Sequence, residues 1–434
     1  MIKTGSSCRV ITPPLGIPMG GYASRPGPAM GVHDDLHARA LVIKNGGDLC
    51  AILSLELLYV TQDVVKEVRE IAEEKVGIPA DAVMVAAVHT HSGPSIMGLH
   101  TEGREDLLEK YMASLSDIVS NTLIDAAQGL VEVNLRFGEG GIDGWTINRR
   151  KPYSGPLDNK VAALCFEQGG SAVATIVNFT CHAVVLGHSN LLISADYPGY
   201  VSQTVEKIFG GVCLFLNGAC GEVNPLTPGT MIEKVYDRSM GTFRDAEEMG
   251  ISIACKAIEA LLRSSRVEDA VIKVGREAVQ LEVLSVPEVQ ASDLDDVKEE
   301  LARAEKAGDK ARVEQLKLKA ALTRWMLNVQ IKLRERVRNG YLSTEVQAIR
   351  VGDFVIVGLP GEPFVEIGLA VKQFSPAALT MIVGYANDAI GYVPMDEAFD
   401  EGGYEVMPPA CILGKGAAQA LAEAAWRLLL RLYE

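Results

Sequence analysis

The sequence lacks the features that mark several common protein classes. None of its 434 residues belongs to an apolar run of about 18, so no transmembrane helix is expected. Residues 1–5 contain no apolar core of signal-peptide length, which predicts a cytoplasmic protein. The eight cysteines are scattered without any C-x-x-C pair, and most of them stand in apolar runs. We therefore expect reduced cysteines that pack in the core, although Cys181 and Cys220 adjoin candidate site residues and could be thiolate ligands.

Basic residues and nucleotide-binding motifs are also scarce. Lysine and arginine number 41 against 56 acidic residues, and the net charge of −15 argues against nucleic-acid partners and against docking on anionic lipid. The serine hydrolase motif G-x-S-x-G is absent, and no Walker or dinucleotide glycine signature stands out. Aromatic residues make up only 6%, which argues against a stacking platform for sugars. The 48% of apolar residues is ordinary for a globular protein with a large core.

A β-hairpin pattern occurs three times, over residues 38–55, 161–179 and 344–359. In each case an apolar run reaches a glycine-containing turn and a second apolar run returns, which predicts a hairpin whose returning strand is covered on both faces. The residues that follow the three returning strands are Glu56, His182 and Glu362, and all three types can bind metal. A fourth apolar run, 212–216, leads to Glu222. Strand ends that converge on one edge of a sheet can build a site from residues distant in sequence.

The segment 84–95, M-V-A-A-V-H-T-H-S-G-P-S, carries the clearest chemical signal. Its apolar start predicts a buried strand, and because alternate residues of a strand point the same way, we expect His89 and His91 to project to one side. Two imidazoles there suit a metal ion, or one ligand and one proton carrier. The alternative is a pair of polar residues that cap a strand without any chemistry.

Helical periodicity predicts helices over 62–75, 105–127, 240–264 and 417–432. A stretch rich in Glu, Lys, Ala, Leu and Arg, broken by glycine at 307–309, predicts a helical hairpin inserted at about 290–340. We see no linker and no second domain. The fold prediction is therefore an α/β protein, 1–434, with a single large catalytic domain, a central mixed β-sheet flanked by helices, and a site at the strand ends.

Several motifs together resemble the neutral ceramidase family, zinc-dependent amidases that cleave N-acyl sphingosines. They include G-V-H-D-D-L-H-A-R-A at 31–40, V-H-T-H-S-G-P at 88–94, I-S-A-D-Y-P-G-Y at 193–200 and V-G-L-P-G-E at 357–362, in the order of the family. The resemblance covers nearly the whole chain. It implies Zn²⁺ as cofactor, with His89, His182, Glu362 and Tyr392 as ligands, and Tyr385 is the alternative tyrosine.

The same resemblance implies roles for other residues. His91 matches a histidine that transfers a proton, and Arg149 matches an arginine that holds the substrate or its oxyanion. We expect Glu222, Asn224 and Glu56 to bind substrate, although Glu56 could equally be a buried carboxylate that braces a loop. The family's G-D-V-S-P-N appears here as G-E-V-N-P-L, so Asn224 replaces the serine, which excludes a serine nucleophile.

The leading functional prediction is a zinc-dependent amidohydrolase that cleaves a ceramide-like N-acyl amide with metal-activated water. An alternative keeps the metal and changes the substrate to another N-acyl amine, an ester or a sugar-like molecule. A second alternative is a non-catalytic binding protein on an enzyme scaffold. A lipid substrate requires an apolar funnel above the metal, whereas a sugar or peptide requires aromatic and polar walls. The partner is then a small N-acyl molecule, and the sequence makes no prediction of oligomeric state.

Overall fold

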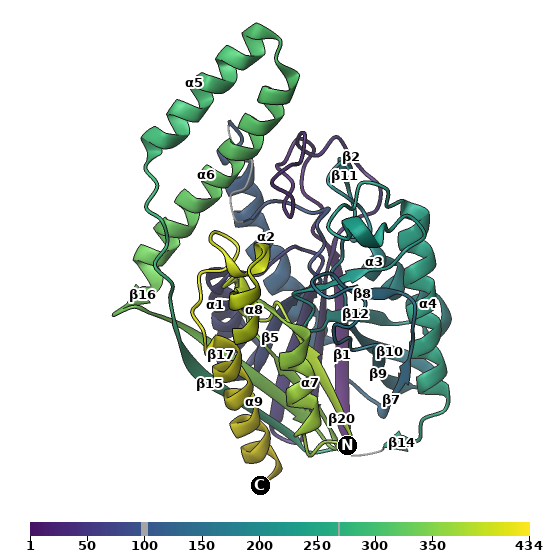
Figure 1. Ribbon diagram of the computed structural model, residues 1–434. Helices are drawn as coiled ribbons and strands as arrows, with labels where there is room; N and C mark the ends of the chain where they lie inside the picture. The colour runs from purple at the N-terminus through teal and green to yellow at the C-terminus, as the bar shows by residue number, and fades with distance from the viewer. Residues whose placement is uncertain (97–102, 268–269) are drawn as a thin grey trace.

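The computed structural model describes residues 1–96, 103–267 and 270–434, and most of its strands belong to three mixed five-stranded sheets (Figure 1). The first sheet has the order β5-β4-β3-β1-β6. Its strands are β1 (Ile2–Val10), β3 (His37–Asn45), β4 (Asp48–Leu55), β5 (Val83–Ala87) and β6 (Val131–Glu132). Strands β3 and β4 form the first predicted hairpin, which turns at Gly46 with a φ of 59° that favours glycine. Strand β5 runs parallel to β4, so both carboxyl ends reach the same edge of the sheet.

Two helices cover one face of this sheet. Helix α1 (Gln62–Ile71) continues as a π-helical turn over Ala72–Val76, and α2 (Glu105–Gln128) packs on β1 and β3. Helix α1 buries Val64, Val65 and Val68, which share one side of the helix because of their spacing. The other face of the sheet meets the second and third sheets, which explains why β5 is buried along its whole length.

The second sheet has the order β12-β10-β9-β7-β14. Its strands are β7 (Asn134–Gly141), β9 (Lys160–Gln168), β10 (Ser171–Phe179), β12 (Val212–Asn217) and β14 (Arg266–Val267). Helices α3 (Tyr197–Phe209) and α4 (Phe243–Leu262) pack on it, and α4 starts with a capping box in which Thr242 and Asp245 exchange hydrogen bonds. Because β12 runs parallel to β10, the carboxyl ends of these two strands also lie together.

The third sheet has the order β15-β17-β18-β20, with β16 paired to β17. Its strands are β15 (Ile272–Glu282), β16 (Val337–Arg338), β17 (Tyr341–Val351), β18 (Phe354–Gly358) and β20 (Leu379–Val383). Helix α9 (Ala417–Tyr433) packs on β15 and β17, while α7 (Val365–Gln373) packs on β20 and on α9. The remaining short elements are α8 (Asp396–Glu401) and three strand pairs: β2 (Gly31–Val32) with β11 (Leu192–Ile193), β8 (Thr146–Asn148) with β13 (Val223–Pro225), and β19 (Glu362–Pro363) with β21 (Tyr392–Val393).

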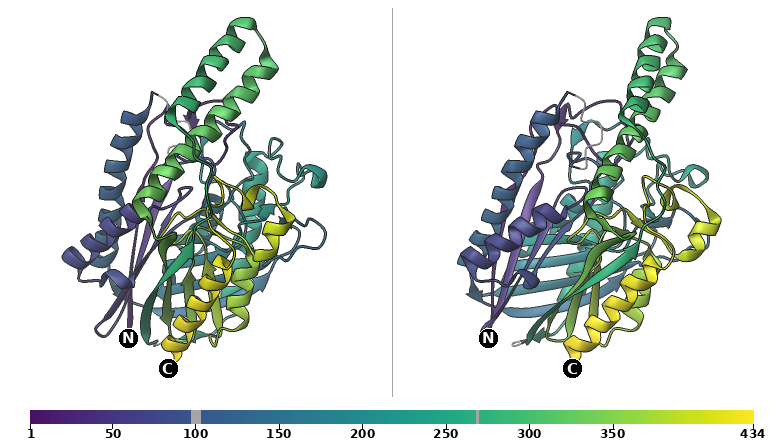
Figure 2. Two further views of the ribbon diagram at one scale, coloured as in Figure 1. Left: turned by 60° about the vertical axis from the view of Figure 1, so that its left-hand side comes forward. Right: turned by 90° about the vertical axis from the view of Figure 1, so that its left-hand side faces the viewer.

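Helices α5 (Ala291–Ala307) and α6 (Lys310–Arg336) form an antiparallel hairpin between β15 and β17. Gly308 ends α5 in the left-handed conformation, and Asp309 begins α6 by accepting a hydrogen bond from the backbone N–H of Arg312. The far end of the hairpin extends away from the sheets, on the side of the molecule opposite both termini (Figures 1 and 2). Among the described residues no helix is both long enough and apolar enough to cross a bilayer.

The predicted α/β fold with mixed sheets and flanking helices is confirmed. The strands are divided among three sheets, whereas the sequence suggested one central sheet. The three pairs of parallel neighbours, β4 with β5, β10 with β12 and β18 with β20, explain how the predicted strand ends meet.

Candidate metal centre

Three side chains, each just beyond a strand of a different large sheet, meet at the centre of the molecule. His89 follows β5, His182 follows β10 and Glu362 follows β18. The Nε2 atoms of His89 and His182 lie 3.4 and 3.3 Å from Oε2 of Glu362, and all three side chains are buried. The arrangement brings two nitrogen donors and one oxygen donor to a common point.

Hydrogen bonds fix which nitrogen of each imidazole faces that point. Nδ1 of His89 donates to the carbonyl of Leu58 at 2.8 Å, and Nδ1 of His182 donates to the carbonyl of Cys220 at 2.6 Å. Each Nε2 therefore presents its lone pair, which is the usual arrangement of a histidine that ligates a metal. Nε2 of His182 and Oε2 of Glu362 have no hydrogen-bond partner in the described part of the chain, although both are buried. Since buried polar atoms are almost always satisfied, these residues fit a metal ion.

His91 lies beside this pair, but strand alternation does not place it there. Strand β5 ends at Ala87, and His89 has a φ of 68°, so the chain turns before the two histidines. The turn still sets Nε2 of His91 only 3.1 Å from Nε2 of His89, and the ligand atoms of the three histidines all lie within 4.8 Å of one another. Gly21 makes room for the ring, because a Cβ at that position would be 2.4 Å from Nδ1 of His91. The prediction of two neighbouring imidazoles is therefore right, and its geometric reason was wrong.

The charges of these groups follow from burial and mutual contact. Burial lowers the pKa of His182 to about 4, and the positive Arg149 adds to the effect. Burial together with the neighbouring His89 and His182 holds the pKa of His91 well below its ordinary value. Burial alone would raise the pKa of Glu362, but His89 and His182 hold it well below its ordinary value. Two imidazoles without protons on Nε2 beside a carboxylate form a donor set that binds divalent cations.

Three tyrosines surround the donors. Tyr59 donates a hydrogen bond from its hydroxyl to Oε1 of Glu362. The ring of Tyr385 stacks on His89, with centroids 3.9 Å apart, and its hydroxyl contacts Sγ of Cys220 at 3.1 Å. Tyr392 is paired in register with Glu362 between β21 and β19, and it lines the adjacent cavity. Its role as a fourth ligand stays a prediction, as does the alternative for Tyr385.

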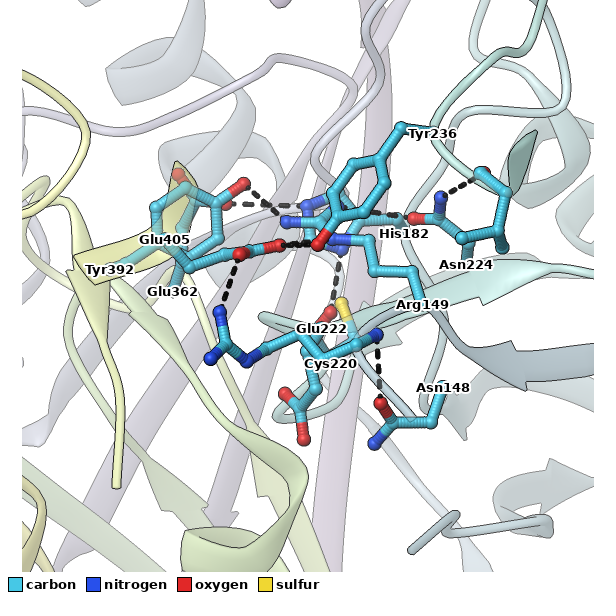
Figure 3. Close-up of polar contacts among 12 residues, drawn as sticks. Asn148, Arg149, His182, Cys220, Glu222, Asn224, Tyr236, Glu362, Tyr392 and Glu405 are labelled. Carbon is cyan, nitrogen blue, oxygen red and sulfur yellow. Dashed lines mark hydrogen bonds and ion pairs between the residues drawn. The ribbon is translucent and has the colours of Figure 1, made fainter. Parts of the chain in front are cut away.

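Arg149 joins the predicted site residues to one another (Figure 3). Its Nη2 donates to the hydroxyl of Tyr392 at 2.9 Å, and its Nη1 donates to Oδ1 of Asn224 at 3.1 Å. The Nε atom donates to Oε1 of Glu405 at 2.7 Å, in a buried ion pair. Glu405 also accepts hydrogen bonds from Arg150 and Tyr236. Glu405 was not among the predicted site residues. It ends the segment G-G-Y-E at 402–405, which was a possible signal.

Two predicted substrate-binding residues do not line the cavity. Both carboxylate oxygens of Glu56 are engaged, since Arg39 donates to Oε1 while the backbone N–H of His37 donates to Oε2 at 2.6 Å. Glu222 accepts a hydrogen bond from the backbone N–H of Val365 at 3.1 Å and lines a separate, smaller cavity of about 240 Å³. Both carboxylates contact the backbone, as the structural alternative for Glu56 expects, and substrate binding by Glu56 and Glu222 stays a prediction. Asn224 lines the cavity as expected.

A cavity of about 610 Å³ opens beside the metal centre. One helix, α6, supplies much of its lining, with mainly apolar residues at three- and four-residue spacing: Leu318, Leu322, Trp325, Val329 and Leu333. Other lining side chains come from loops and carry polar groups: Tyr22, Ser24, His91, Tyr236 and Arg238. The cavity therefore offers both an apolar wall and a polar lining next to the donors.

The cluster of possible metal ligands contains no cysteine among the described residues. All eight cysteines are free, and burial raises the pKa of the Cys181 and Cys220 thiols well above their ordinary value. His33 and Asp34, which precede β3, make structural contacts. The ring of His33 stacks on Phe243, and Asp34 accepts a hydrogen bond from the backbone N–H of Ala195. Asp196 caps α3 by accepting a hydrogen bond from the backbone N–H of Tyr197.

The fold and the donor set define this chain as an α/β protein whose buried histidines and glutamate could hold a metal ion beside a large cavity. Residues 4–239 match the family model described as neutral/alkaline non-lysosomal ceramidase, N-terminal. Because the match covers more than half of the chain, the chain belongs to that family.

Curated relatives and solved structures agree with this assignment. The chain is 27% identical to the neutral ceramidase of Pseudomonas aeruginosa over 271 residues, which are 56% of this chain and 39% of that one. It is 25% identical to neutral ceramidase B of Dictyostelium discoideum over 48% of this chain and 33% of that one. The chain thus spans only about a third to two fifths of these relatives. The neutral ceramidase of Mycobacterium tuberculosis is 23% identical over 89% of this chain and 70% of that one. The crystal structure of the Pseudomonas enzyme superposes on 99% of this chain and 74% of its own, with a TM-score of 0.75 at 20% identity.

Proposed function

We propose that this protein is a zinc-dependent amidohydrolase that cleaves an N-acyl amide. The observation that carries the proposal is the convergence of the His89 and His182 Nε2 atoms on Oε2 of Glu362, next to a cavity with an apolar wall. The family and the neutral ceramidases it resembles support amide hydrolysis of a lipid-like substrate. Two nitrogen donors, a carboxylate and room for another ligand suit catalytic zinc.

The wall of α6 supports an acyl chain as part of the substrate. Leu322 and Trp325 line the cavity one turn apart, and Leu318 and Val329 extend the apolar surface along the helix. Burying a methylene group on such a surface stabilises the complex by about 0.8 kcal/mol. A polar sugar would gain nothing from this wall, so the acyl part of the substrate packs along α6.

The chemistry that zinc supplies in such a site is Lewis acidity, which lowers the pKa of water and polarises a carbonyl oxygen. The protein would supply the other steps. Arg149 and the hydroxyl of Tyr392, 2.9 Å apart, form one polar surface that donates hydrogen bonds to the oxyanion as water attacks the carbonyl carbon. His91 lines the cavity beside the donors, where it would accept a proton from the attacking water and return that proton to the amine as the carbon–nitrogen bond breaks.

The first experiment compares N-acyl amines with and without metal. A short-chain ceramide, an acyl amino acid and an acyl amino sugar are offered to the zinc-loaded protein, to the chelated protein and to chelated protein with zinc restored. We expect chelation to abolish acyl release and zinc to restore it. Zinc-loaded protein that cleaves none of these amides would contradict the proposal.

A matched set of histidine variants assigns the roles. His182→Ala should lose most of the bound zinc and of the activity, because it removes a buried donor. His91→Ala should keep the zinc and lose turnover. His33→Ala, whose ring stacks on Phe243 outside the cavity, is the control and should change neither. Full activity in His182→Ala would refute the assignment of the ligands.

A further inference from the structure

The charge of the cavity differs in sign from that of the whole protein. The chain carries a net charge of −15, yet the side chains that line the cavity include Arg149, Arg238, Lys332 and Arg336, and none of the described lining residues is a carboxylate. Two of these arginines are neutralised by ion pairs, Arg149 by Glu405 at 2.7 Å and Arg336 by Asp388 at 2.6 Å. The remaining arginine, Arg238, has a different environment.

Arg238 is a buried cation without a carboxylate partner in the described part of the chain. Only 4% of its surface is exposed. Its Nε donates to the carbonyl of Val184 at 3.0 Å and its Nη1 donates to Oγ1 of Thr230 at 3.0 Å, so both of its partners are neutral. The two N–H groups of its Nη2 have no acceptor among the described residues. Val184 follows the predicted ligand His182 by two residues, and Arg238 lines the same cavity as His91. The guanidinium of Arg238 is therefore held in the cavity beside the metal centre.

A second buried guanidinium adds to the positive charge. Arg25 donates to the backbone carbonyls of Gly20 at 3.2 Å and of His91 at 2.5 Å, and it is not ion-paired in the part of the chain that the structure describes. Burial lowers the pKa of Arg25 to about 10, so it keeps its charge at neutral pH. Burying a charge without a counter-charge costs several kcal/mol, and a bound anion would offset that cost.

From this geometry we propose that the substrate carries a carboxylate on its amine-derived half, as in an N-acyl amino acid, and that Arg238 binds this carboxylate. The inference rests on the proposed amide hydrolysis and names its substrate class. With the acyl chain along α6, the amine-derived half lies against the polar lining that contains Arg238. A guanidinium with free N–H groups matches a carboxylate in shape and charge, whereas a neutral sphingosine would leave the cation uncompensated.

The test uses two substrates that differ only in charge, N-dodecanoylglycine and N-dodecanoylglycinamide. We expect zinc-loaded wild-type protein to favour the acid in kcat/KM by about 10- to 100-fold, the range of a charge-assisted hydrogen bond. Arg238→Gln should lose that preference, because its kcat/KM should fall more for N-dodecanoylglycine than for N-dodecanoylglycinamide. Arg238→Lys should recover part of it, and Arg334→Gln, an exposed arginine of α6, should behave as wild type.

A binding measurement separates this inference from the proposed function. Calorimetry on metal-free wild type should show that N-dodecanoylglycine binds at least tenfold more tightly than N-dodecanoylglycinamide. In metal-free Arg238→Gln the two molecules should bind with the same weak affinity. Cleavage without a preference for the acid, or equal binding of both molecules to wild type, would overturn the inference and leave the amidase proposal standing. Since both comparisons can be made in wild type, a misfolded variant would not prevent the test.

Discussion

The buried carboxylate of Glu405 offers a quantitative test of how the site is held together. It pairs with Arg149 at 2.7 Å and with Arg150 at 3.0 Å, and its side chain is fully buried. In Glu405→Gln the amide keeps one acceptor, but its NH₂ group faces a guanidinium, Arg149 loses its counter-charge, and Arg150 keeps only its pair with the more exposed Glu401. Breaking a buried ion pair in this way costs about 3–5 kcal/mol. We expect urea unfolding of the metal-free protein to show a loss of that size at pH 7.

The pH dependence of that loss has a defined sign. Burial alone would raise the pKa of Glu405, but Arg149 holds it below the ordinary value of 4.5. A lowered pKa means that the carboxylate stabilises the fold above pH 4.5 and that this contribution disappears as the pH falls through the folded-state pKa. The difference between wild type and Glu405→Gln should therefore shrink in acid.

A neighbouring carboxylate provides the control. Glu401 also pairs with Arg150, at 3.3 Å, but its side chain is 39% exposed, so Glu401→Gln should barely move the unfolding midpoint. If Glu405→Gln were no less stable than Glu401→Gln, or if its deficit were the same at pH 7 and pH 4, the reasoning about the buried pair would be refuted.

Three further predictions use other parts of the structure. Gly21→Ala should reduce turnover at least tenfold while the bound metal, measured by elemental analysis, is retained, because its Cβ would push His91 aside. Burial raises the pKa of Asp196 from 3.8 to about 6, so wild type should lose about 2 kcal/mol of stability relative to Asp196→Asn as the pH rises from 4 to 6; parallel unfolding curves would contradict this. Trp325→Ala should lower kcat/KM more for a dodecanoyl than for a butanoyl amide, and an equal effect on both would argue against the acyl wall.

The strand ends that carry the site were predictable because of their composition. Strands β5, β10 and β18 are covered on both faces, and their apolar runs stop abruptly at polar residues. Strands β1 and β15 were missed because they carry glycine, serine and charged residues that weaken the pattern, and because the carboxyl end of β1 and one side of β15 are largely exposed. Helix α3 was missed because Pro198 and Gly199 stand in its first turn.

The direction in which a side chain points was much harder to predict. Glu56 and His182 both follow central strands, yet one braces Arg39 and the other faces Glu362. The difference depends on the loops after the strands and on how separate sheets pack, and neither is encoded locally. Arg238 gave no sequence signal at all, because its significance depends on its three-dimensional contacts, which include no ion pair among the described residues.

The origin of the three donors has a consequence for folding. His89, His182 and Glu362 follow strands of three different sheets, so no large sheet supplies more than one of them. A metal ion bound by all three would act as a cross-link between sheets that are otherwise joined by apolar packing and a few buried hydrogen bonds, such as that from Ser54 to the carbonyl of Phe215. Its binding free energy would then add to the cohesion of the whole chain rather than to one layer, and the three sheets would unfold as one cooperative unit.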